Sequence, residues 1–188
     1  WESGYPAAAG IGTQHGGVLI DFNAVSGEVD IAPLDNDWQR AAHVYSDEVL
    51  ISHRTDAEKG TPKFERGKSL SDHQLEMIYI SGTAAIRGEE SIVTGDVLVQ
   101  TEITLENIQH LVGLEEGREK LPEHSGKLEL LRVYLKHEED AKIVKEDMDK
   151  LCPDVPIVYL YADVCREELL VEIDCLLYTS DAADDLIG

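Results

Sequence analysis

The chain has 188 residues, 43% of them hydrophobic, which is enough to build one domain with a core. It carries 38 acidic and 16 basic residues, and the formal net charge of -22 at pH 7 argues against nucleic-acid binding, because an acidic surface repels phosphates. No run is long and apolar enough to span a membrane and no signal segment opens the chain, so we expect no membrane partner.

The first third of the chain shows little regular periodicity. Residues 16–23 and 27–31 are predicted to form a β-hairpin, and residues 33–64 carry turn formers and charges. This part cannot build a core alone, and the first residue is Trp1 rather than Met. We therefore expect residues 1–61 to be the remnant of an N-terminal domain and its linker.

Regular patterns begin at about residue 76. Alternating side chains over residues 77–81 predict a buried strand that runs into Gly82. Asp96 is expected to cap a helix over residues 97–113. The predicted apolar stripe of this helix comprises Val99, Ile103, Ile108, Leu111 and Val112.

Three more strands and a second helix follow. The pattern predicts a strand over residues 128–135, a helix over residues 143–151 that Pro153 stops, and strands over residues 157–163 and 168–174. The order βαβαββ predicts an α+β fold class, in which two helices pack on one face of a mixed and mostly four-stranded sheet.

The last of these strands carries a candidate catalytic group. Leu169, Val171 and Ile173 alternate with residues 170, 172 and 174, so the two sets face opposite sides of the sheet. If the first set faces the core, Glu172 points away from it. Its carboxylate is then either solvated or enclosed by whatever lies across that face.

Residues 175–188 need a separate interpretation. The run from Cys175 to Asp184 resembles the translation of a sequencing-library adapter, so we expect a non-native tail that carries no function. An acidic tail that belongs to the protein is the alternative. The predicted folded domain therefore covers residues 62–174.

Cysteine and histidine usage indicates neither a disulfide framework nor a metal site. Cys152, Cys165 and Cys175 are few and widely spaced, which favours a reducing cytoplasm. No two of the seven histidines have the spacing of a zinc-binding pair. We expect neither a metal nor an organic cofactor.

Several short motifs between residues 62 and 174 resemble the RidA/YjgF superfamily. They are Ile80-Ser-Gly-Thr-Ala-Ala-Ile86, Gly95-Asp96-Val97, Gln100-Thr101, Asn107-Ile108 and Leu170-Val171-Glu172-Ile173. The resemblance implies a chorismate-mutase-like fold, a homotrimer and active sites between subunits. Imine deaminases of this superfamily carry Pro-Ala-Arg where this chain has Pro156-Ile157-Val158, and the missing Arg argues against deamination.

A narrower set of motifs resembles the chorismatase family, whose members are also called pteridine-dependent deoxygenases. The matching residues are Gly4 to Ala7, Gly10 to Gly12, Gln39 with Tyr45, Pro62 to Arg66, Ser81 to Ala84 and Ala162 to Arg166. Ile86 to Gly88 and Val93-Thr94 depart from the family pattern. The resemblance implies that most of a RidA-like N-terminal part is absent from this chain.

Chorismatases cleave the enolpyruvyl ether of chorismate into pyruvate and either a dihydroxycyclohexadiene acid or a hydroxybenzoate. The reaction needs a carboxylic acid that is still protonated near neutral pH, and burial among apolar groups favours this. Glu172 matches the catalytic glutamate of the family, so the resemblance implies that it is the general acid. A solvated carboxylate at the rim of the strand is the alternative.

The resemblance also implies further site residues. Arg166 and Arg66 are expected to bind the carboxylates of a small anionic substrate, although a surface ion pair with Glu167 or Glu168 is the alternative for Arg166. Cys165 matches the branch that forms 3-hydroxybenzoate, and a small buried apolar residue is its alternative. The remaining predicted substrate-binding residues are Ala84, Ala85, Tyr5 and Gly12.

Two other functions stay open from the sequence. One is a RidA-like enamine or imine deaminase, and the other is a non-catalytic protein that binds small carboxylates in a RidA-like cleft. The charge balance gives no support to a ribonuclease.

Overall fold

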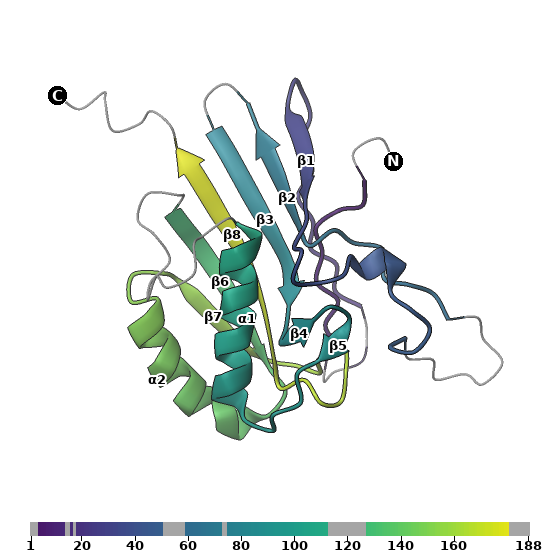
Figure 1. Ribbon diagram of the computed structural model, residues 1–188. Coiled ribbons are helices and arrows are strands. Elements are labelled where there is room, and N and C mark those ends of the chain that lie inside the picture. Colours follow the sequence, from purple (N-terminus) through teal and green to yellow (C-terminus); the bar gives the residue numbers. More distant parts are fainter. Residues whose placement is uncertain are drawn as a thin grey trace.

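A computed structural model describes residues 4–13, 16, 18–50, 59–72, 75–112 and 127–180. Its main feature is a six-stranded sheet in the order β1-β2-β3-β8-β6-β7, with both helices on one face (Figure 1). The strands are β1 (Asp30–Leu34), β2 (Gly67–Ser71), β3 (Leu75–Thr83), β6 (Lys127–Leu135), β7 (Ile157–Tyr161) and β8 (Val171–Ser180). The helices are α1 (Val97–Leu111) and α2 (Ala141–Leu151).

The sheet is mixed, as the sequence predicts. Strands β6 and β7 are parallel, whereas β1–β2, β2–β3, β3–β8 and β6–β8 are antiparallel pairs. The elements β3, α1, β6, α2, β7 and β8 follow one another in the predicted βαβαββ order. The prediction of two helices on one face of a mixed sheet is therefore confirmed.

The first two strands extend the sheet beyond the four that we predict. The predicted hairpin over residues 16–23 and 27–31 is wrong, because residues 18–29 contain no strand and residues 30–34 pair with β2 instead. Residues 18–25 expose several apolar side chains to solvent, among them Val18, Leu19, Ile20 and Phe22. Strand β1 therefore belongs to the same sheet as the predicted domain of residues 62–174.

Strand β8 begins and ends later than predicted. It covers residues 171–180 rather than 168–174, and its whole length pairs with β3 or β6. Cys175 and Leu177 lie in the hydrophobic core. Residue 174 lies within β8 in the structure, and the predicted non-native tail from residue 175 stays a prediction.

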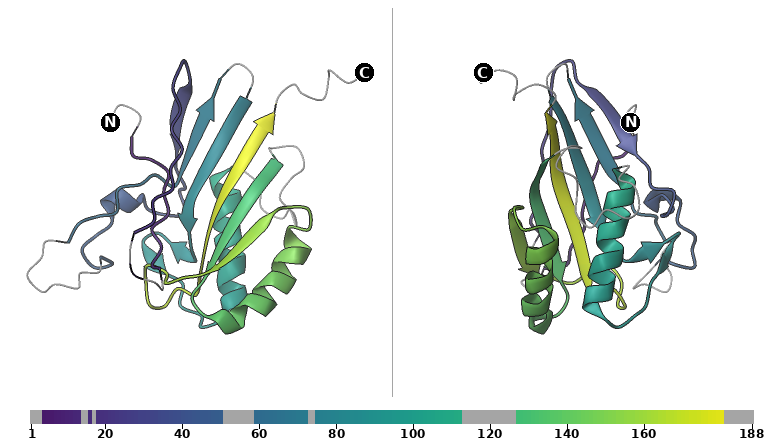
Figure 2. Two further views of the ribbon diagram at one scale, coloured as in Figure 1. Left: turned by 180° about the vertical axis from the view of Figure 1, so that it is seen from behind. Right: turned by 60° about the vertical axis from the view of Figure 1, so that its left-hand side comes forward.

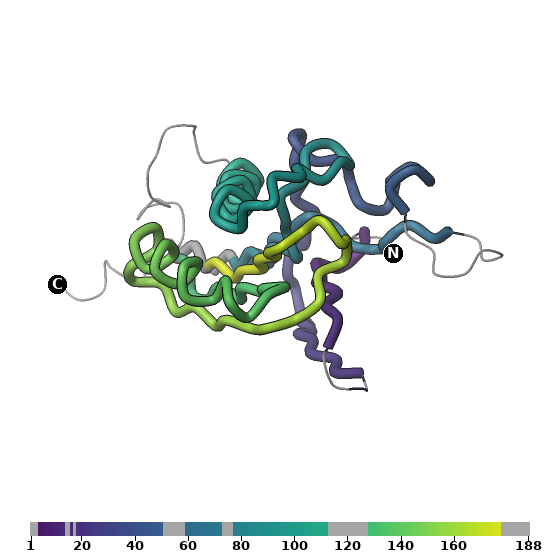
Figure 3. Tube along the Cα trace, turned by 90° about the horizontal axis from the view of Figure 1, so that it is seen from below, coloured from purple at the N-terminus to yellow at the C-terminus, as the bar shows by residue number. Residues whose placement is uncertain are grey.

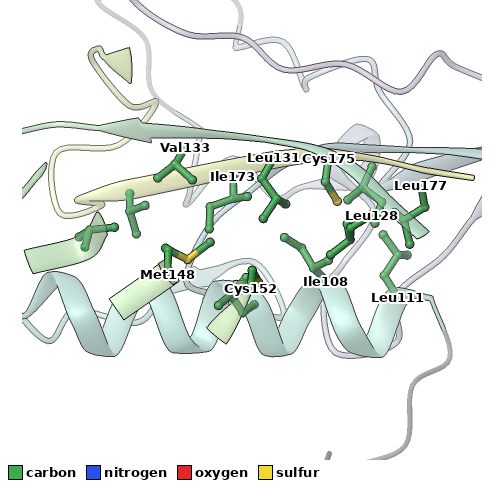
Figure 4. Close-up of a cluster of buried hydrophobic side chains, with 14 of the residues drawn as sticks. Ile108, Leu111, Leu128, Leu131, Val133, Met148, Cys152, Ile173, Cys175 and Leu177 are labelled. Atoms are coloured by element: carbon green, nitrogen blue, oxygen red, sulfur yellow. The ribbon is translucent and has the colours of Figure 1, made fainter. Parts of the chain in front are cut away.

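The core lies between the sheet and the two helices (Figure 4). Ile108 from α1 and Met148 from α2 pack against Leu131, Val133 and Ile173 of the two central strands β6 and β8, and all five side chains are almost fully buried. Alternation along β8 therefore directs Ile173 to this core and Glu172 to the opposite face.

Helix α1 begins where the sequence predicts, because the Asp96 side chain accepts hydrogen bonds from the backbone of Leu98 and Val99. Its buried face differs from the predicted stripe, since Val99 is 37% exposed. The buried face also carries four polar residues, Gln100, Thr101, Thr104 and Asn107. Each of these side chains donates to a backbone carbonyl, so its donor stays hydrogen-bonded, whereas the buried Asn107 Oδ1 atom has no hydrogen-bond partner among the described residues.

The N-terminal segment crosses the face of the sheet that lacks helices. Figure 2 (left) shows it in purple in front of the strands, and Figure 3 shows it on the opposite side of the sheet from α1. Isolated bridges tie it to the rest of the fold, between Ala7 and Glu65 and between Gly12 and Asp163. We call residues 4–12 the strap.

A remaining two-stranded hairpin joins β3 to α1. It consists of β4 (Ile86–Arg87) and β5 (Glu90–Ser91), with Gly88 in the left-handed conformation at its turn. Neither helix in the described residues is long and apolar enough to cross a lipid bilayer.

Candidate active site

The site centres on Glu172, on the face of β8 that points away from the helices. Its side chain is buried, with the residue only 5% exposed. Tyr134 of β6 is its direct cross-strand neighbour. The sequence left open whether this carboxylate is solvated or enclosed, and the structure shows that it is enclosed.

Burial changes the acidity of this carboxyl group. Desolvation raises the pKa of Glu172 to about 7, and the nearby Asp174 carboxylate adds to the effect, whereas Arg66 opposes it. A carboxylic acid with this pKa is substantially protonated at neutral pH. Glu172 can therefore donate a proton under conditions in which an exposed glutamate cannot.

Glycine at position 82 leaves room for the Glu172 carboxyl group. A Cβ atom at Gly82 would lie 1.9 Å from Glu172 Oε1 and 2.9 Å from its carboxyl carbon. The same position is 3.1 Å from the Cβ atom of Ala9 in the strap. Glu172 is thus packed against the backbone of β3, with the strap beside it.

The strap is fastened to the end of β3. The Ala8 amide donates to Ser81 Oγ at 2.9 Å, and the Gly82 amide donates to the Ala8 carbonyl at 3.3 Å. Ser81 Oγ in turn donates to the Glu65 carbonyl at 2.5 Å. Ser81 therefore links the strap to the chain that enters β2.

Both ends of the strap have further attachments. The Tyr5 amide donates to Glu65 Oε1 at 2.9 Å, and the Glu65 amide donates to the Pro6 carbonyl at the same distance. At the other end, Gly12 and Asp163 exchange backbone hydrogen bonds of 2.9 and 3.0 Å. The predicted site residues Tyr5 and Gly12 lie in these two anchored ends.

A second buried carboxylate lies next to Glu172 on the same face. Asp174 accepts hydrogen bonds from Arg132 Nε at 2.7 Å and from the Tyr134 hydroxyl at 2.9 Å. Desolvation raises the pKa of Asp174, and the hydrogen bond from Arg132 opposes that rise. These contacts fix Asp174 as a charged neighbour of the candidate acid.

Arg66 is buried immediately before β2, with 4% of its surface exposed. Its Nη2 atom donates to the Arg40 carbonyl at 2.7 Å and to the Tyr45 hydroxyl. The guanidinium carbon lies 5.5 Å from the centre of the Tyr45 ring. Within the described part of the chain, Arg66 Nε is buried and has no hydrogen-bond partner.

Arg166 approaches the same Tyr45 ring. It is 8% exposed, and its Nη1 atom donates to the Glu89 carbonyl at 2.8 Å and to Ser91 Oγ at 2.9 Å. Its guanidinium carbon also lies 5.5 Å from the Tyr45 ring. The structure therefore brings Arg66 and Arg166 together around Tyr45, and Arg166 is buried rather than at the surface.

Cys165 lies in the loop between β7 and β8. The residue is exposed, yet desolvation of its thiol raises the pKa to about 11, and the charge of Glu172 adds to this effect while Arg166 opposes it. Cys165 is thus close to both side chains, and its thiol is protonated near neutral pH. The thiol is therefore not a thiolate nucleophile near neutral pH, and a contact between Cys165 and a ligand stays a prediction.

Ala84 and Ala85 belong to a small hydrophobic cluster with Ile86, Val164 and Leu169. Both alanines are almost fully buried. The structure shows both alanines tightly packed in this cluster. Contact between these alanines and a ligand stays a prediction.

Helix α1 positions the loop that carries Cys165 and Arg166. The Gln100 side chain donates to the Glu168 carbonyl at 2.9 Å and accepts from the Leu170 amide at 2.8 Å. Gln100 is fully buried, so these bonds lie in a region of low dielectric constant. They fix the chain at Leu170, just before β8 and two residues before Glu172.

Sequence reasoning misses several groups around Glu172. Tyr134 and Asp174 could have been found from alternation, because both lie on the non-core face of their predicted strands. No local sequence pattern predicts the roles of Ser81 and Glu65, because these roles depend on contacts with the strap. No cluster of three or more potential metal-ligating side chains occurs among the described residues.

Known proteins resemble this chain over most of its length. A chorismatase from Streptomyces rapamycinicus is 33% identical over 177 residues, and a 3-hydroxybenzoate synthase from Streptomyces hygroscopicus is 32% identical over 185 residues. Each alignment covers 90% of this chain and 50% of the relative. The chain therefore spans about half the length of these curated relatives.

Solved structures show the same relationship. A crystal structure of a chorismatase superposes with a TM-score of 0.68 at 25% identity, covering 92% of this chain and 51% of the other. Yeast Mmf1 superposes with a TM-score of 0.54 at 9% identity, covering 79% of this chain and 98% of the other, and supports the RidA/YjgF-like fold alone. No family model matches the chain. These comparisons confirm the resemblance to chorismatases that the sequence motifs indicate.

Proposed function

We propose that this chain carries the acid and the carboxylate-binding groups of an enzyme that cleaves the enolpyruvyl ether of chorismate. The observation that carries the proposal is the buried Glu172 carboxyl group, whose pKa of about 7 keeps it partly protonated. The relatives named chorismatase and 3-hydroxybenzoate synthase support the choice of substrate.

The reaction begins with transfer of the Glu172 proton to the methylene carbon of the enolpyruvyl group. A C–H bond forms, and the adjacent carbon becomes an oxocarbenium ion that water can attack. One proton of the added water goes to the Glu172 carboxylate, which leaves a neutral hemiketal. When the bond between the hemiketal carbon and the ring oxygen breaks, the hemiketal hydroxyl proton moves to the ring oxygen, giving pyruvate and a ring alcohol. The Glu172 carboxylate formed in the first step is the nearest base that can recover a proton.

Two arginines supply the positive charge for a substrate with two carboxylates. Arg66 and Arg166 are already buried beside Tyr45, so their desolvation is completed before a ligand arrives. Arg66 Nε has no hydrogen-bond partner among the described residues. It can therefore donate to a carboxylate of the substrate. Because the protein has a net charge of -22, this local pairing has to overcome long-range repulsion.

Pyruvate release tests the proposal directly. The protein is mixed with chorismate, and pyruvate is followed through lactate dehydrogenase while chromatography identifies the second product. We expect Glu172→Gln to abolish pyruvate release and the matched exposed variant Glu167→Gln to retain it. Full activity of Glu172→Gln would exclude the acid role, and saturable chorismate binding without pyruvate would favour a carboxylate-binding protein.

The role of Arg166 has its own test. Arg166→Ala removes a buried cation that hydrogen-bonds Glu89 and Ser91, and we expect KM for chorismate to rise at least about tenfold with a smaller change in kcat. Arg87→Ala, which removes an arginine paired with Glu106 near the surface, is the control. An unchanged KM in Arg166→Ala would assign this residue to structure alone.

The product class and the assembly are part of the same proposal. Hydrolysis alone gives the dihydroxycyclohexadiene acid, and 3-hydroxybenzoate forms only if the ring also loses one water. Cys165, which lies close to Glu172 and Arg166, supports this second branch. A homotrimer follows from the RidA-like resemblance, and sedimentation of the purified protein tests it. The three free cysteines support a cytoplasmic location.

A further inference from the structure

The strap lies beside the Gly82 backbone on which Glu172 packs. Gly82 lies against the Glu172 carboxyl group, and Ala9 lies against Gly82. Ala8, Ala9 and Gly10 are themselves exposed. The exposed strap therefore contacts the residue on which the candidate acid packs.

Ser81 is the central attachment of the strap. It is 2% exposed, accepts the Ala8 amide hydrogen and donates to the Glu65 carbonyl. Gly82, the next residue, bonds to the Ala8 carbonyl and contacts Glu172. The group that holds the strap is thus adjacent to the residue on which the acid packs.

Glu65 is the second attachment. Its side chain, 8% exposed, accepts the Tyr5 amide hydrogen, and its Oε2 atom lies 3.8 Å from His43 Nδ1. Gly4 has a positive φ of 75°, and a Cβ atom there would lie 2.6 Å from Glu65 Oε1 and 3.4 Å from Lys68 Nζ. The start of the strap is therefore fitted closely around this carboxylate.

We propose that Ser81 and Glu65 are positioning residues for the reaction, because they fasten the strap over the end of β3 and so keep water away from Glu172. Neither residue needs to touch the substrate. The inference rests on the proposed function, since it explains how the acid stays protonated.

Other groups also act on Glu172 and have to be held constant. Asp174 on β8, Tyr134 on β6, Cys165 in the loop before β8 and Arg66 before β2 all interact with it electrostatically. Variants of Ser81 and Glu65 leave each of these side chains in place. A change in the titration of Glu172 in such variants therefore reports how well the strap keeps water away from Glu172.

The test measures the titration of Glu172 by carbon-13 NMR, with Glu172→Gln identifying its signal. We expect Ser81→Ala and Glu65→Ala to lower the pKa by about one unit through hydration, and to speed hydrogen exchange at the Ala8 amide. Glu65→Gln keeps an acceptor for the Tyr5 amide and should behave as wild type. Thr101→Ala, which removes a buried hydroxyl within α1, is the matched control.

A second measurement links the strap to catalysis. The basic limb of kcat/KM against pH should move to lower pH in Ser81→Ala and Glu65→Ala by the same amount as the NMR titration, which a purely structural defect would not produce. An unchanged Glu172 titration in both variants would overturn the inference, whether or not the strap amides exchange faster. Titration near 4.5 in the wild type would instead reject the proposed function itself.

Discussion

The buried acid should make the protein less stable as the pH rises. In the folded state the pKa of Glu172 is about 7, whereas 4.5 is its ordinary value in an unfolded chain. Between these values the folded state binds the proton more tightly than the unfolded state does. The free energy of unfolding therefore falls as the pH rises through this window, and the loss is complete above the folded pKa.

The size of this effect follows from the two pKa values. Each pKa unit corresponds to about 1.4 kcal/mol, so the difference between 4.5 and about 7 corresponds to about 3 kcal/mol. Glu172→Gln removes the titration and keeps a side chain of similar volume. Its stability relative to wild type should rise by about 3 kcal/mol between pH 4 and pH 8.

Urea unfolding at a series of pH values measures this difference. Other carboxylates titrate in both proteins, so their contributions cancel when the variant is compared with wild type at each pH. Glu167→Gln is the matched control, because its parent residue is exposed and should leave the pH dependence unchanged. Parallel curves for wild type and Glu172→Gln would refute the reasoning, because they would show that Glu172 ionises as readily in the folded state as in the unfolded one.

Two further predictions concern packing. Gly82→Ala should lower the free energy of unfolding by about 1–3 kcal/mol, because the new Cβ atom would meet Glu172 Oε1 at 1.9 Å. Combining it with Glu172→Ala should recover part of that loss, and strict additivity in urea unfolding would contradict the predicted clash. Ile108→Ala should cost about 2–5 kcal/mol, whereas Val99→Ala on the exposed side of α1 should cost less than about 0.5 kcal/mol. Equal thermal shifts for the two would contradict the observed orientation of the helix.

Local periodicity is enough to predict the elements that bury one apolar face. Alternation over residues 77–81 predicts β3, and the Asp96 cap predicts the start of α1. The same rule predicts that Glu172 faces away from the core, since Ile173 beside it is fully buried. These features depend on neighbouring residues, so the sequence contains the information directly.

Features that depend on distant contacts are harder to predict. Strand β1 pairs with β2, more than thirty residues later, and the local pattern that suggested a strand over residues 27–31 named the wrong partner. Gln100 and Asn107 read as polar interruptions of a helix, yet both are fully buried and bonded to backbone groups of other segments. The enclosure of Glu172 likewise depends on the strap, whose glycines and alanines have no periodic signal.

The pair of hydrogen bonds made by Gln100 sets a spacing as well as a position. The side-chain amide of Gln100 bonds to residues 168 and 170 at once, so it fixes the number of residues between these two contacts ahead of Glu172. A single insertion between these contacts would shift every later side chain of β8 to the opposite face. Length variation among relatives should therefore be tolerated before Glu168 but excluded between Glu168 and Glu172, unless the residue at position 100 changes with it.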